Sequence, residues 1–357
     1  MKKIICYLLL LILSPLSMFC HSDDTLHTIQ TAINTVTNSH DPISITTLKG
    51  GNSGSLIFCA ETSNHHKYVV RFLNNNITLA TNNIVDAHAK EVICAKIASD
   101  NGYGPKLHLF DAENNLMVMD YLPPEPPAPC SQQSDERCRA LVDFLKKMHY
   151  GPSFPKTGTV FDQIDMFLEN VSKQNKFVTK TELDKCFAIS HTIQAALKNY
   201  HHTAPCHRDL HTNNVLFSQG KFYAIDYELA GQDDPFFDLA LIAHFNKLQD
   251  EQLLSFYLRR MPSTQEIAKI YLMKQLLLVY YTAIVIILVP EDFPDSNIPF
   301  DTYQHMLPQN PAEIDLGNSI HKLGVASRAY HKALINFETD ECQNALKIVS
   351  QYKAISI

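Results

Sequence analysis

The sequence predicts an α+β protein in which a small β-rich part precedes a larger, mainly helical part. Residues 43–73 and 107–122 hold short runs of β-branched and aromatic residues that are separated by turn residues. Beyond residue 135, apolar residues recur at helical spacing in one segment after another. With 357 residues, of which 45% are hydrophobic and 19% charged, the chain is long enough for one large or two smaller packed domains.

The N-terminus has the layout of a secretory signal. Two lysines precede an apolar run at residues 4–13, which is too short for a comfortable membrane span, and Pro15 follows it. The small residues of Cys20–Ser22 offer a cleavage site. We therefore expect residues 1–22 to be a signal peptide that exports the protein, with secretion into a host cell as one destination. The alternative is an uncleaved anchor that leaves the rest of the chain in the cytoplasm, and only then would a membrane be a partner.

The first part of the chain is expected to alternate strands with single helices. A helix is predicted at 24–39, and three strands in 43–73 with a turn at Gly50–Gly51. Residues 82–99 predict a helix whose buried side would include Ile93, and 107–122 predict a β-hairpin. Prolines at 123–130 mark an extended connector, because proline lacks the backbone donor that helix and sheet need.

The second part reads as helix after helix. Helices are predicted at 135–150, 161–174, 180–202, 234–248, 250–260, 264–290 and 311–353. The exception is 204–230, which predicts a loop, a strand, a turn at Gly220 and a second strand. The apolar end of 264–290 is better suited to a core helix than to a membrane span, because its longest run has about 14 apolar residues.

Charge and cysteine usage narrow the choice of partners. The net charge of −7 argues against a nucleic-acid backbone as the main partner. The nine cysteines show no metal-ligand spacing, so no zinc site is predicted. Export would permit disulfides, and Cys130 with Cys138 is the nearest local pair, although scattered thiols fit the sequence equally well.

Residues 207–228, HRDLHTNNVLFSQGKFYAIDYE, concentrate polar groups around two predicted strands. Asp209 and Asn214 lie on the loop before the first strand, and Asp226 follows the second. Because a hairpin brings the end of one strand near the start of its partner, these side chains are expected to converge on a hard cation such as Mg²⁺. Asp209, earliest on the loop, is the candidate base for a substrate hydroxyl.

This pattern resembles the kinase-like phosphotransferases, in the branch of aminoglycoside phosphotransferases and choline kinases. The resemblance rests on His-x-Asp-x-x-x-x-Asn at 207–214, Ile-Asp-x-Glu at 225–228 and Asp238, and it covers most of 43–250. It implies a two-lobed, protein-kinase-like fold. Residues 23–122 would form the nucleotide-binding N-lobe, 123–134 the connector, and 135–357 a C-lobe that carries the catalytic loop and the acceptor site.

The resemblance also implies which residues bind ATP. Glycines and small polar residues at 50–55 would cover the phosphates, and the segment around 120–122 would meet the adenine. The alternative for residues 50–55 is a plain hairpin turn. Glu91 would pair with Arg71 of the strand, and the alternative for Glu91 is a solvated helix residue. The predicted nucleotide residues are Gly51, Asn52, Ser53, Ser55, Arg71, Glu91, Asp120 and Leu122, and the predicted metal ligands are Asn214 and Asp226.

The expected activity is ATP- and Mg²⁺-dependent transfer of the γ-phosphate to a hydroxyl of a small, cationic amino-alcohol such as choline or ethanolamine. A cationic acceptor favours aromatic rings and a nearby acid. The candidate acceptor residues are Asp209, His211, Tyr227, Glu228 and Asp234, and the candidate rings are Tyr227, Phe236, Phe237, Tyr280 and Tyr281, although such aromatics equally fit a core. The chain has no tryptophan, which choline kinases commonly use. An aminoglycoside, thiamine and an inactive ligand-binding module therefore remain alternatives.

Overall fold

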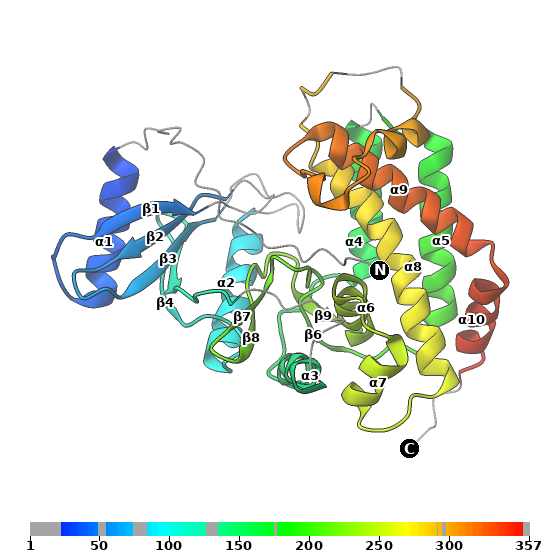
Figure 1. Cartoon of the computed structure of the whole chain (residues 1–357), viewed down its shortest axis with the longest axis horizontal. Coiled ribbons are helices and arrows are strands. Elements are labelled where there is room, and N and C mark those ends of the chain that lie inside the picture. The colour runs from blue at the N-terminus through cyan, green and yellow to red at the C-terminus, as the bar shows by residue number, and fades with distance from the viewer. Residues whose placement is uncertain are drawn as a thin grey trace, which may run out of the picture. The chain divides into compact units, whose positions relative to one another are not determined.

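The computed structural model describes residues 23–48, 55–73, 84–125, 135–174, 177–290, 292–294 and 298–352. They form two compact units (Figure 1). Unit 1 draws on Met1–Ser134 and Thr212–Leu229, and unit 2 on Asp135–His211 and Ala230–Ile357. The sequence placed all of 135–357 in the helical part, whereas the segment Thr212–Leu229 packs with the β-rich unit. The remaining residues, which include the predicted signal peptide, the residues Gly51 to Ser53 and Cys130, lie outside the described part of the chain.

Unit 1 is built on a five-stranded antiparallel sheet of order β1-β2-β3-β5-β4. The strands are β1 (Ser44–Leu48), β2 (Ile57–Glu61), β3 (Lys67–Phe72), β4 (Leu107–Asp111) and β5 (Leu116–Asp120), and the helices of this unit are α1 (Asp23–Thr37) and α2 (Ile84–Asp100). Ile29 and Ile33 of α1 pack against Phe58 and Val70 of the sheet, and all four side chains are almost fully buried. Helix α1 therefore covers the apolar face of the sheet, which must be buried against another element.

A two-stranded hairpin completes unit 1. It joins β7 (Val215–Ser218) to β8 (Lys221–Ala224) through Gln219 and Gly220, which have φ values of +51° and +74°. Two left-handed residues suit a tight hairpin turn, because their twist matches that of the strands. The hairpin is bonded to the rest of the unit, since the N–H of Ala224 donates to the carbonyl of Tyr103 at 2.8 Å.

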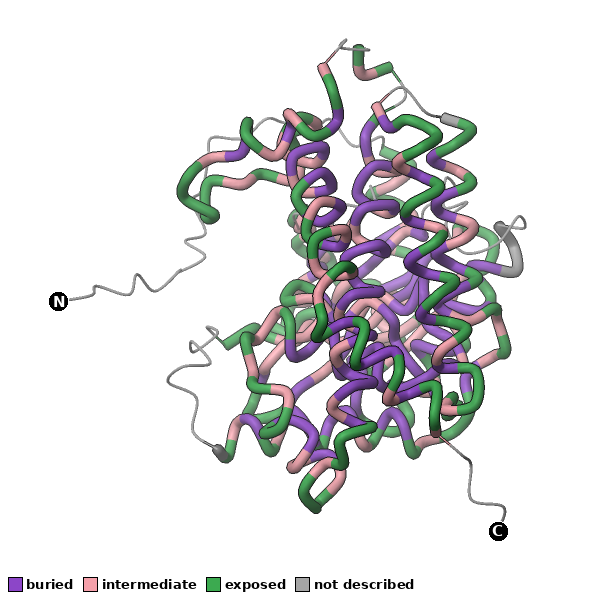
Figure 2. Tube along the Cα trace, turned by 90° about the vertical axis from the view of Figure 1, so that its right-hand side faces the viewer, coloured by how far each residue is buried: buried purple, intermediate pink, exposed green. Residues whose placement is uncertain are grey.

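Unit 2 is a helical assembly around α8 (Thr264–Ile287). Its other helices are α3 (Asp135–His149), α4 (Val160–Gln174), α5 (Lys180–Leu197), α6 (Pro235–Asn246), α7 (Asp250–Leu258), α9 (Ser319–Phe337) and α10 (Asp340–Ser350), with short turns η2 (Phe300–Met306) and η3 (Pro311–Glu313). Strands β6 (Ala204–Cys206) and β9 (Gly231–Asp233) pair antiparallel. Helix α8 packs against α4, α6, α9 and α10. The helices therefore bury their inner sides and expose their outer ones (Figure 2).

Helix α8 is a core helix, as the sequence favoured. In the described part of the chain it is the helix whose length and composition would allow it to cross a membrane. However, 72% of its most apolar window is buried inside the protein. It begins at a capping box in which Ser263 and Glu266 each accept from the other's backbone N–H, a signal typical of a helix N-terminus.

The C-terminal segment 311–353 is mostly helical, as predicted, but it is not continuous. Its described residues form the short 3-10 helix η3 and two separate helices, α9 and α10. The break has a local cause, because the Asn318 and Thr339 side chains each accept a backbone N–H and so cap a new helix start. The predicted buried side of α2 was wrong at Ile93, which is 47% exposed.

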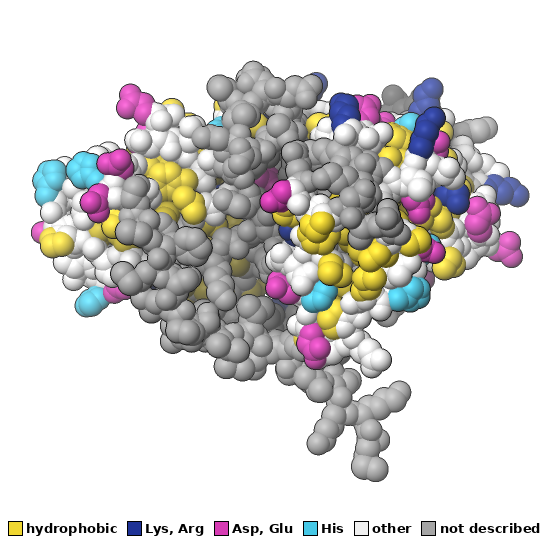
Figure 3. Space-filling model, turned by 90° about the horizontal axis from the view of Figure 1, so that it is seen from above, with side chains coloured by type: hydrophobic (Ala, Val, Ile, Leu, Met, Phe, Trp, Pro, Cys, Tyr) yellow, Lys and Arg dark blue, Asp and Glu magenta, His cyan; other side chains and the backbone are white. Residues whose placement is uncertain are grey.

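The surface carries both signs of charge. On the face shown in Figure 3, Lys and Arg side chains lie over unit 2 and are interspersed there with Asp and Glu. Exposed ion pairs also occur in unit 1, among them Lys96–Asp100 on α2 at 2.7 Å. Such exposed pairs contribute little to stability, so the buried charges described below matter more.

Candidate active site

The predicted catalytic loop follows β6 in unit 2. Asp209 is partly buried, with 14% of its side chain exposed, and its Oδ2 lies 3.5 Å from Nε2 of His211. The N–H of His211 donates to the carbonyl of Asp209 at 2.9 Å, which folds the loop into a tight turn. The Asp209 carboxylate is thus accessible on a constrained backbone, as a general base requires.

Asp238 at the start of α6 holds this loop. Its Oδ2 accepts the N–H of His207 and its Oδ1 the N–H of Arg208, both at 2.8 Å. The carboxylate is fully buried. Burial alone would raise the pKa of Asp238, but the hydrogen bond from His149 and the donors of the loop lower it below its usual range. The structure thus gives Asp238 the bracing position that the resemblance implied.

Arg208, the residue before Asp209, is fixed in an unusual backbone conformation. Its φ of +66° lies in the left-handed region, which costs a side-chain-bearing residue on the order of 1 kcal/mol or more. The fully buried guanidinium offsets this cost, with Nε 2.7 Å from Oδ2 of Asp233 and Nη2 donating to the carbonyl of Gln232 at 2.8 Å. Gly231 leaves the room for it, because a Cβ there would stand 3.1 Å from Nη2.

The predicted metal ligands belong to the hairpin of unit 1. Asn214 precedes β7, Asp226 follows β8, and the N–H of Ile225 donates to the carbonyl of Asn214 at 3.0 Å. The hairpin register therefore brings the two residues to the same end of the strands, as expected. Asp226 has a φ of +69°, a second left-handed residue of the kind that clusters at functional sites.

Arg71 on β3 joins two acids in unit 1. Its Nη1 donates to Oε1 of Glu91 on α2 at 2.6 Å, and its Nη2 to Oδ1 of Asp226 at 2.8 Å. Arg71 and Glu91 are almost completely buried, which excludes the solvated alternative for Glu91. Burial lowers the pKa of Arg71, but the carboxylates of Asp226 and Glu91 outweigh it and raise that pKa above its ordinary value.

This arrangement fits a nucleotide with Mg²⁺ by its donor chemistry. Asn214 and Asp226 offer an amide oxygen and a carboxylate, which suit a hard cation. The fixed guanidinium of Arg71 suits phosphate oxygens. Ser55 is buried before β2, whereas the other predicted residues of the phosphate-covering segment are not described.

The segment predicted to contact the adenine, residues 120–122, begins at the last residue of β5. The side chain of Asp120 is engaged, because its Oδ1 lies 2.6 Å from Nε2 of His108. Its N–H donates to the carbonyl of Lys106 at 2.9 Å, and Leu122 follows in partly exposed, irregular backbone. The expectation that backbone groups would act here stays a prediction.

Three of the predicted acceptor residues are almost fully buried. Tyr227 is 2% exposed and its hydroxyl donates to the carbonyl of Ala224 at 3.2 Å. Glu228 is 9% exposed, and its backbone carbonyl accepts from Nζ of Lys90 at 2.6 Å. Both belong to unit 1.

Asp234 is the third. It is 1% exposed, caps α6 by accepting the N–H of Phe236 at 3.0 Å, and pairs with Nζ of Lys269 at 2.6 Å. A carboxylate engaged in a helix cap and a buried ion pair has a structural task. The acceptor role of Asp234 stays a prediction.

Most of the candidate rings are core. Phe237 and Tyr280 are fully buried and pack edge to face at 5.5 Å between centroids. Phe236 is 7% exposed and covers the ammonium of Lys269 at 4.6 Å. Tyr281, one residue after Tyr280, lies on another side of α8 and is partly exposed.

Tyr281 belongs to an aromatic group that adjoins Asp209 in unit 2. Its ring lies 5.6 Å from that of Phe245 on α6, and the Phe245 ring lies 6.2 Å from that of His211 on the catalytic loop. Burial and the charge of Asp209 raise the pKa of the Tyr281 phenol, which therefore stays protonated. The sequence missed Phe245, although its position at the C-terminal end of a helix that starts beside the loop could have indicated it.

Comparisons with known proteins show the family and the fold of this chain. The model of the phosphotransferase enzyme family (APH) matches residues 44–267, more than half of the chain. The chain belongs to this family. Among curated relatives, Protein LicA of Haemophilus influenzae is 26% identical over 162 residues, or 44% of this chain and 48% of that protein. A thiamine kinase of Escherichia coli O6:K15:H31 (strain 536 / UPEC) is 26% identical over 167 residues, 47% of this chain and 54% of the kinase.

Solved structures of the family share the fold. A choline/ethanolamine kinase family protein from Mesorhizobium loti has a TM-score of 0.66 at 20% identity, covering 92% of this chain and 99% of that one. Choline kinase LicA from Streptococcus pneumoniae has a TM-score of 0.60 at 18% identity, covering 92% and 100%. A structure of LicA in complex with AMP has the same score over 86% and 98%. The two-lobed, protein-kinase-like fold is thereby confirmed, while the chain spans about half the length of the curated relatives named above.

Proposed function

We propose that the protein is an ATP- and Mg²⁺-dependent kinase that phosphorylates a hydroxyl of a small, cationic amino-alcohol of the choline or ethanolamine type. The observation that carries this proposal is the accessible Asp209 carboxylate, held by the braced loop and bordered by the group of His211, Phe245 and Tyr281. Aromatic rings beside a carboxylate attract a desolvated cation. The names of the solved relatives support the same acceptor class.

Each residue has a defined task in the proposed reaction. Asp209 orients the acceptor hydroxyl and takes its proton while the acceptor oxygen bonds to the γ-phosphorus. The bond between that phosphorus and the β–γ bridging oxygen breaks, and ADP leaves. Arg71 holds phosphate oxygens, and Asn214 with Asp226 would hold Mg²⁺, which when bound neutralises phosphate charge. The LicA complex with AMP supports nucleotide binding by this fold.

A panel of acceptors tests the proposal. The purified protein, ATP and Mg²⁺ are incubated with choline, ethanolamine, thiamine and an aminoglycoside, and ADP release is measured. Phosphorylation of choline or ethanolamine is expected, with a loss of about 10²-fold or more in Asp209→Ala. Asp184→Asn, which changes an exposed acid on α5, is the matched control and is expected to retain full activity.

The other outcomes identify the alternatives. Phosphorylation of thiamine alone would favour the second candidate, which the identity to a thiamine kinase supports. Nucleotide binding that survives Asp209→Ala without any turnover indicates an inactive binding module. The absence of both binding and turnover would refute the kinase proposal.

We also propose that residues 1–22 direct the protein out of the cell of origin, with a host cell as the place where it meets ATP. The order of charged, apolar and small residues at the N-terminus supports this proposal. N-terminal sequencing of the protein from the culture medium is expected to begin near residue 23. A full-length protein found only in the membrane fraction would favour the uncleaved anchor.

A further inference from the structure

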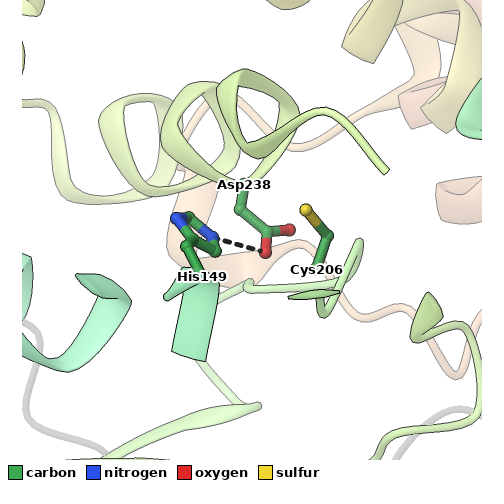
Figure 4. A group of neighbouring side chains, drawn as sticks. All are labelled: His149, Cys206 and Asp238. Carbon is green, nitrogen blue, oxygen red and sulfur yellow. Dashed lines mark hydrogen bonds and ion pairs between the residues drawn. The ribbon is translucent and has the colours of Figure 1, made fainter. Parts of the chain in front are cut away.

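Two places outside the reaction described above gather polar side chains. The first is a buried group in unit 2, where His149 and Asp238 point toward each other and Cys206 lies beside them (Figure 4). Both nitrogens of His149 and both oxygens of Asp238 have hydrogen-bond partners. The Cys206 thiol donates to the carbonyl of Asp233 at 3.4 Å. The polar atoms of this group are therefore engaged within the protein.

The second place is an open cavity of about 260 Å³ in unit 1. It lies where α1 ends and the chain crosses to β1, and the turn between β2 and β3 also borders it. The volume lies just below the range of about 300–1,000 Å³ that drug-sized ligands occupy, so the cavity suits a molecule with a single ring. Its lining includes Asp41, Thr62, Ser63, Asn64, His66 and Tyr68.

The cavity lies on the face of the sheet opposite to the one that carries Arg71. Successive side chains of a strand alternate between two faces, and Tyr68 and Arg71 lie an odd number of residues apart in β3. Tyr68 packs in the layer between α1 and the sheet, whereas Arg71 bonds to Glu91 and Asp226. A ligand in the cavity would therefore leave the position assigned to the nucleotide phosphates free.

Tyr68 is the lining residue whose polar group most clearly requires a ligand. Its side chain is largely buried, with the residue 9% exposed, and its ring contacts those of His66 and His108 at centroid distances of 4.5 and 5.3 Å. Within the described residues its hydroxyl has no hydrogen bond, although a buried tyrosine usually has one. Burial and the charge of Asp120 raise the pKa of this phenol, so it stays protonated and can donate.

The other lining residues offer both donors and acceptors. Oδ1 of Asn64 accepts the hydroxyl of Thr62 at 2.5 Å and the N–H of His66 at 3.3 Å, which leaves the amide nitrogen of Asn64 to donate to a ligand. The Ser63 hydroxyl donates to Oδ2 of Asp41 at 3.3 Å, which leaves Oδ1 as an acceptor. The described lining contains no Lys or Arg, so an anionic ligand is disfavoured.

We propose that this cavity binds a single pyranose ring of a carbohydrate. Sugar hydroxyls both donate and accept, which matches the mixture of amide, carboxylate and hydroxyl groups in the lining. The Tyr68 ring adds an apolar surface with a polar end. A small cation would satisfy Asp41 but would leave two donors, the Tyr68 phenol and the Asn64 amide, without acceptors.

Saturation-transfer NMR on the full chain measures this binding. The probes are glucose, galactose and N-acetylglucosamine, each as the free sugar and as its methyl glycoside, and choline as the cationic alternative. At least one sugar is expected to bind equally well with and without saturating ADP. Tighter binding of the free sugar indicates a metabolite, and tighter binding of the glycoside indicates a sugar within a glycan. Bound sugar is also expected to slow amide hydrogen exchange in the peptide covering residues 62–68.

Two substitutions test the residues that would hold the sugar. Tyr68→Phe removes the hydroxyl and keeps the ring in the core, so it is expected to weaken binding about tenfold, the loss of one hydrogen bond. Asn64→Ala removes the amide donor and is expected to have a similar effect. Tyr223→Phe makes the same change on β8 of unit 1, away from the cavity lining, and should keep wild-type affinity.

Several results would overturn the proposal. These are the absence of binding by any of the sugars, unchanged affinity in both Tyr68→Phe and Asn64→Ala, and displacement of the sugar by ADP. Binding of choline in place of the sugars, with loss of that binding in Asp41→Asn, would also overturn it in favour of a cation. None of these measurements needs turnover, so the carbohydrate site and the proposed kinase activity can fail separately.

Discussion

Replacement of Arg71 by methionine should destabilise unit 1 far more than the same change at an exposed lysine of the same strand. Arg71→Met leaves the carboxylates of Glu91 and Asp226 without their shared cation, and only 6% of the Arg71 side chain and 3% of that of Glu91 are exposed. Removal of one partner from a buried ion pair costs about 3–5 kcal/mol. Lys67→Met removes an exposed partner of Glu61 at 3.3 Å, a pair that solvent screens, and should have no measurable effect.

Hydrogen exchange of the peptide that covers β3 measures both variants, since Lys67 and Arg71 lie in the same strand. The expected destabilisation corresponds to exchange at least about 10²-fold faster in Arg71→Met than in wild type. Arg71→Lys keeps a charge but loses the fork that bridges two acids, so an intermediate effect is expected.

The penalty should also depend on pH. Burial raises the pKa of Glu91 even beside Arg71, and more so without it. With a raised pKa in the folded state, Glu91 takes up a proton at a higher pH in the folded protein than in the unfolded one. The destabilisation by Arg71→Met should therefore shrink as pH falls from 7 toward 5. The reasoning is refuted if Arg71→Met exchanges no faster than Lys67→Met, or if the ratio of variant to wild-type exchange is the same at pH 7 and pH 5.

Three further outcomes follow from buried or constrained residues. Lys269→Met should lower the free energy of unfolding by about 3–5 kcal/mol in urea, because it leaves the buried carboxylate of Asp234 without its cation. His201→Gln should remove a pH-dependent part of the stability, because the bond with Asp233 raises the pKa of His201. That part is present below about pH 6.5 and is lost as pH rises through the folded-state pKa, so urea midpoints at pH 5.5 and 8 check it. Gly220→Ala should destabilise the β7–β8 hairpin by about 1 kcal/mol, since its φ is +74° with open space around it, and exchange of the hairpin amides measures this cost.

Local sequence patterns predicted the strands β1 to β5, β7 and β8, but not the short strands β6 and β9. The β7–β8 hairpin and its turn follow from adjacent residues, so the convergence of Asn214 with Asp226 was visible in the sequence. The same reasoning failed for α2, where periodicity favoured burial of Ile93. Burial of the charged Glu91 became possible only because Arg71, 20 residues earlier on another element, supplies a partner.

The candidate acceptor residues show what the local sequence pattern could not predict. The sequence made Asp234 a candidate substrate acid, but it did not show the buried ion pair that Asp234 forms with Lys269 of α8. Tyr280 and Tyr281 are consecutive but point to different sides of α8, because successive side chains are turned by about 100° around a helix. Only the packing of α6 against α8 decides that Tyr281 meets Phe245 while Tyr280 enters the core.

The sequence by itself therefore determined which groups make up the candidate site: an acid, an amide and a second acid at the spacing of a loop and hairpin, within a β-rich and then helical chain. This was possible because short-range spacing dictates which groups of one hairpin lie together. The tertiary structure alone decided which charges are buried as pairs and which rings border Asp209. Those contacts join residues tens of positions apart, and their stability comes from the burial that packed helices provide.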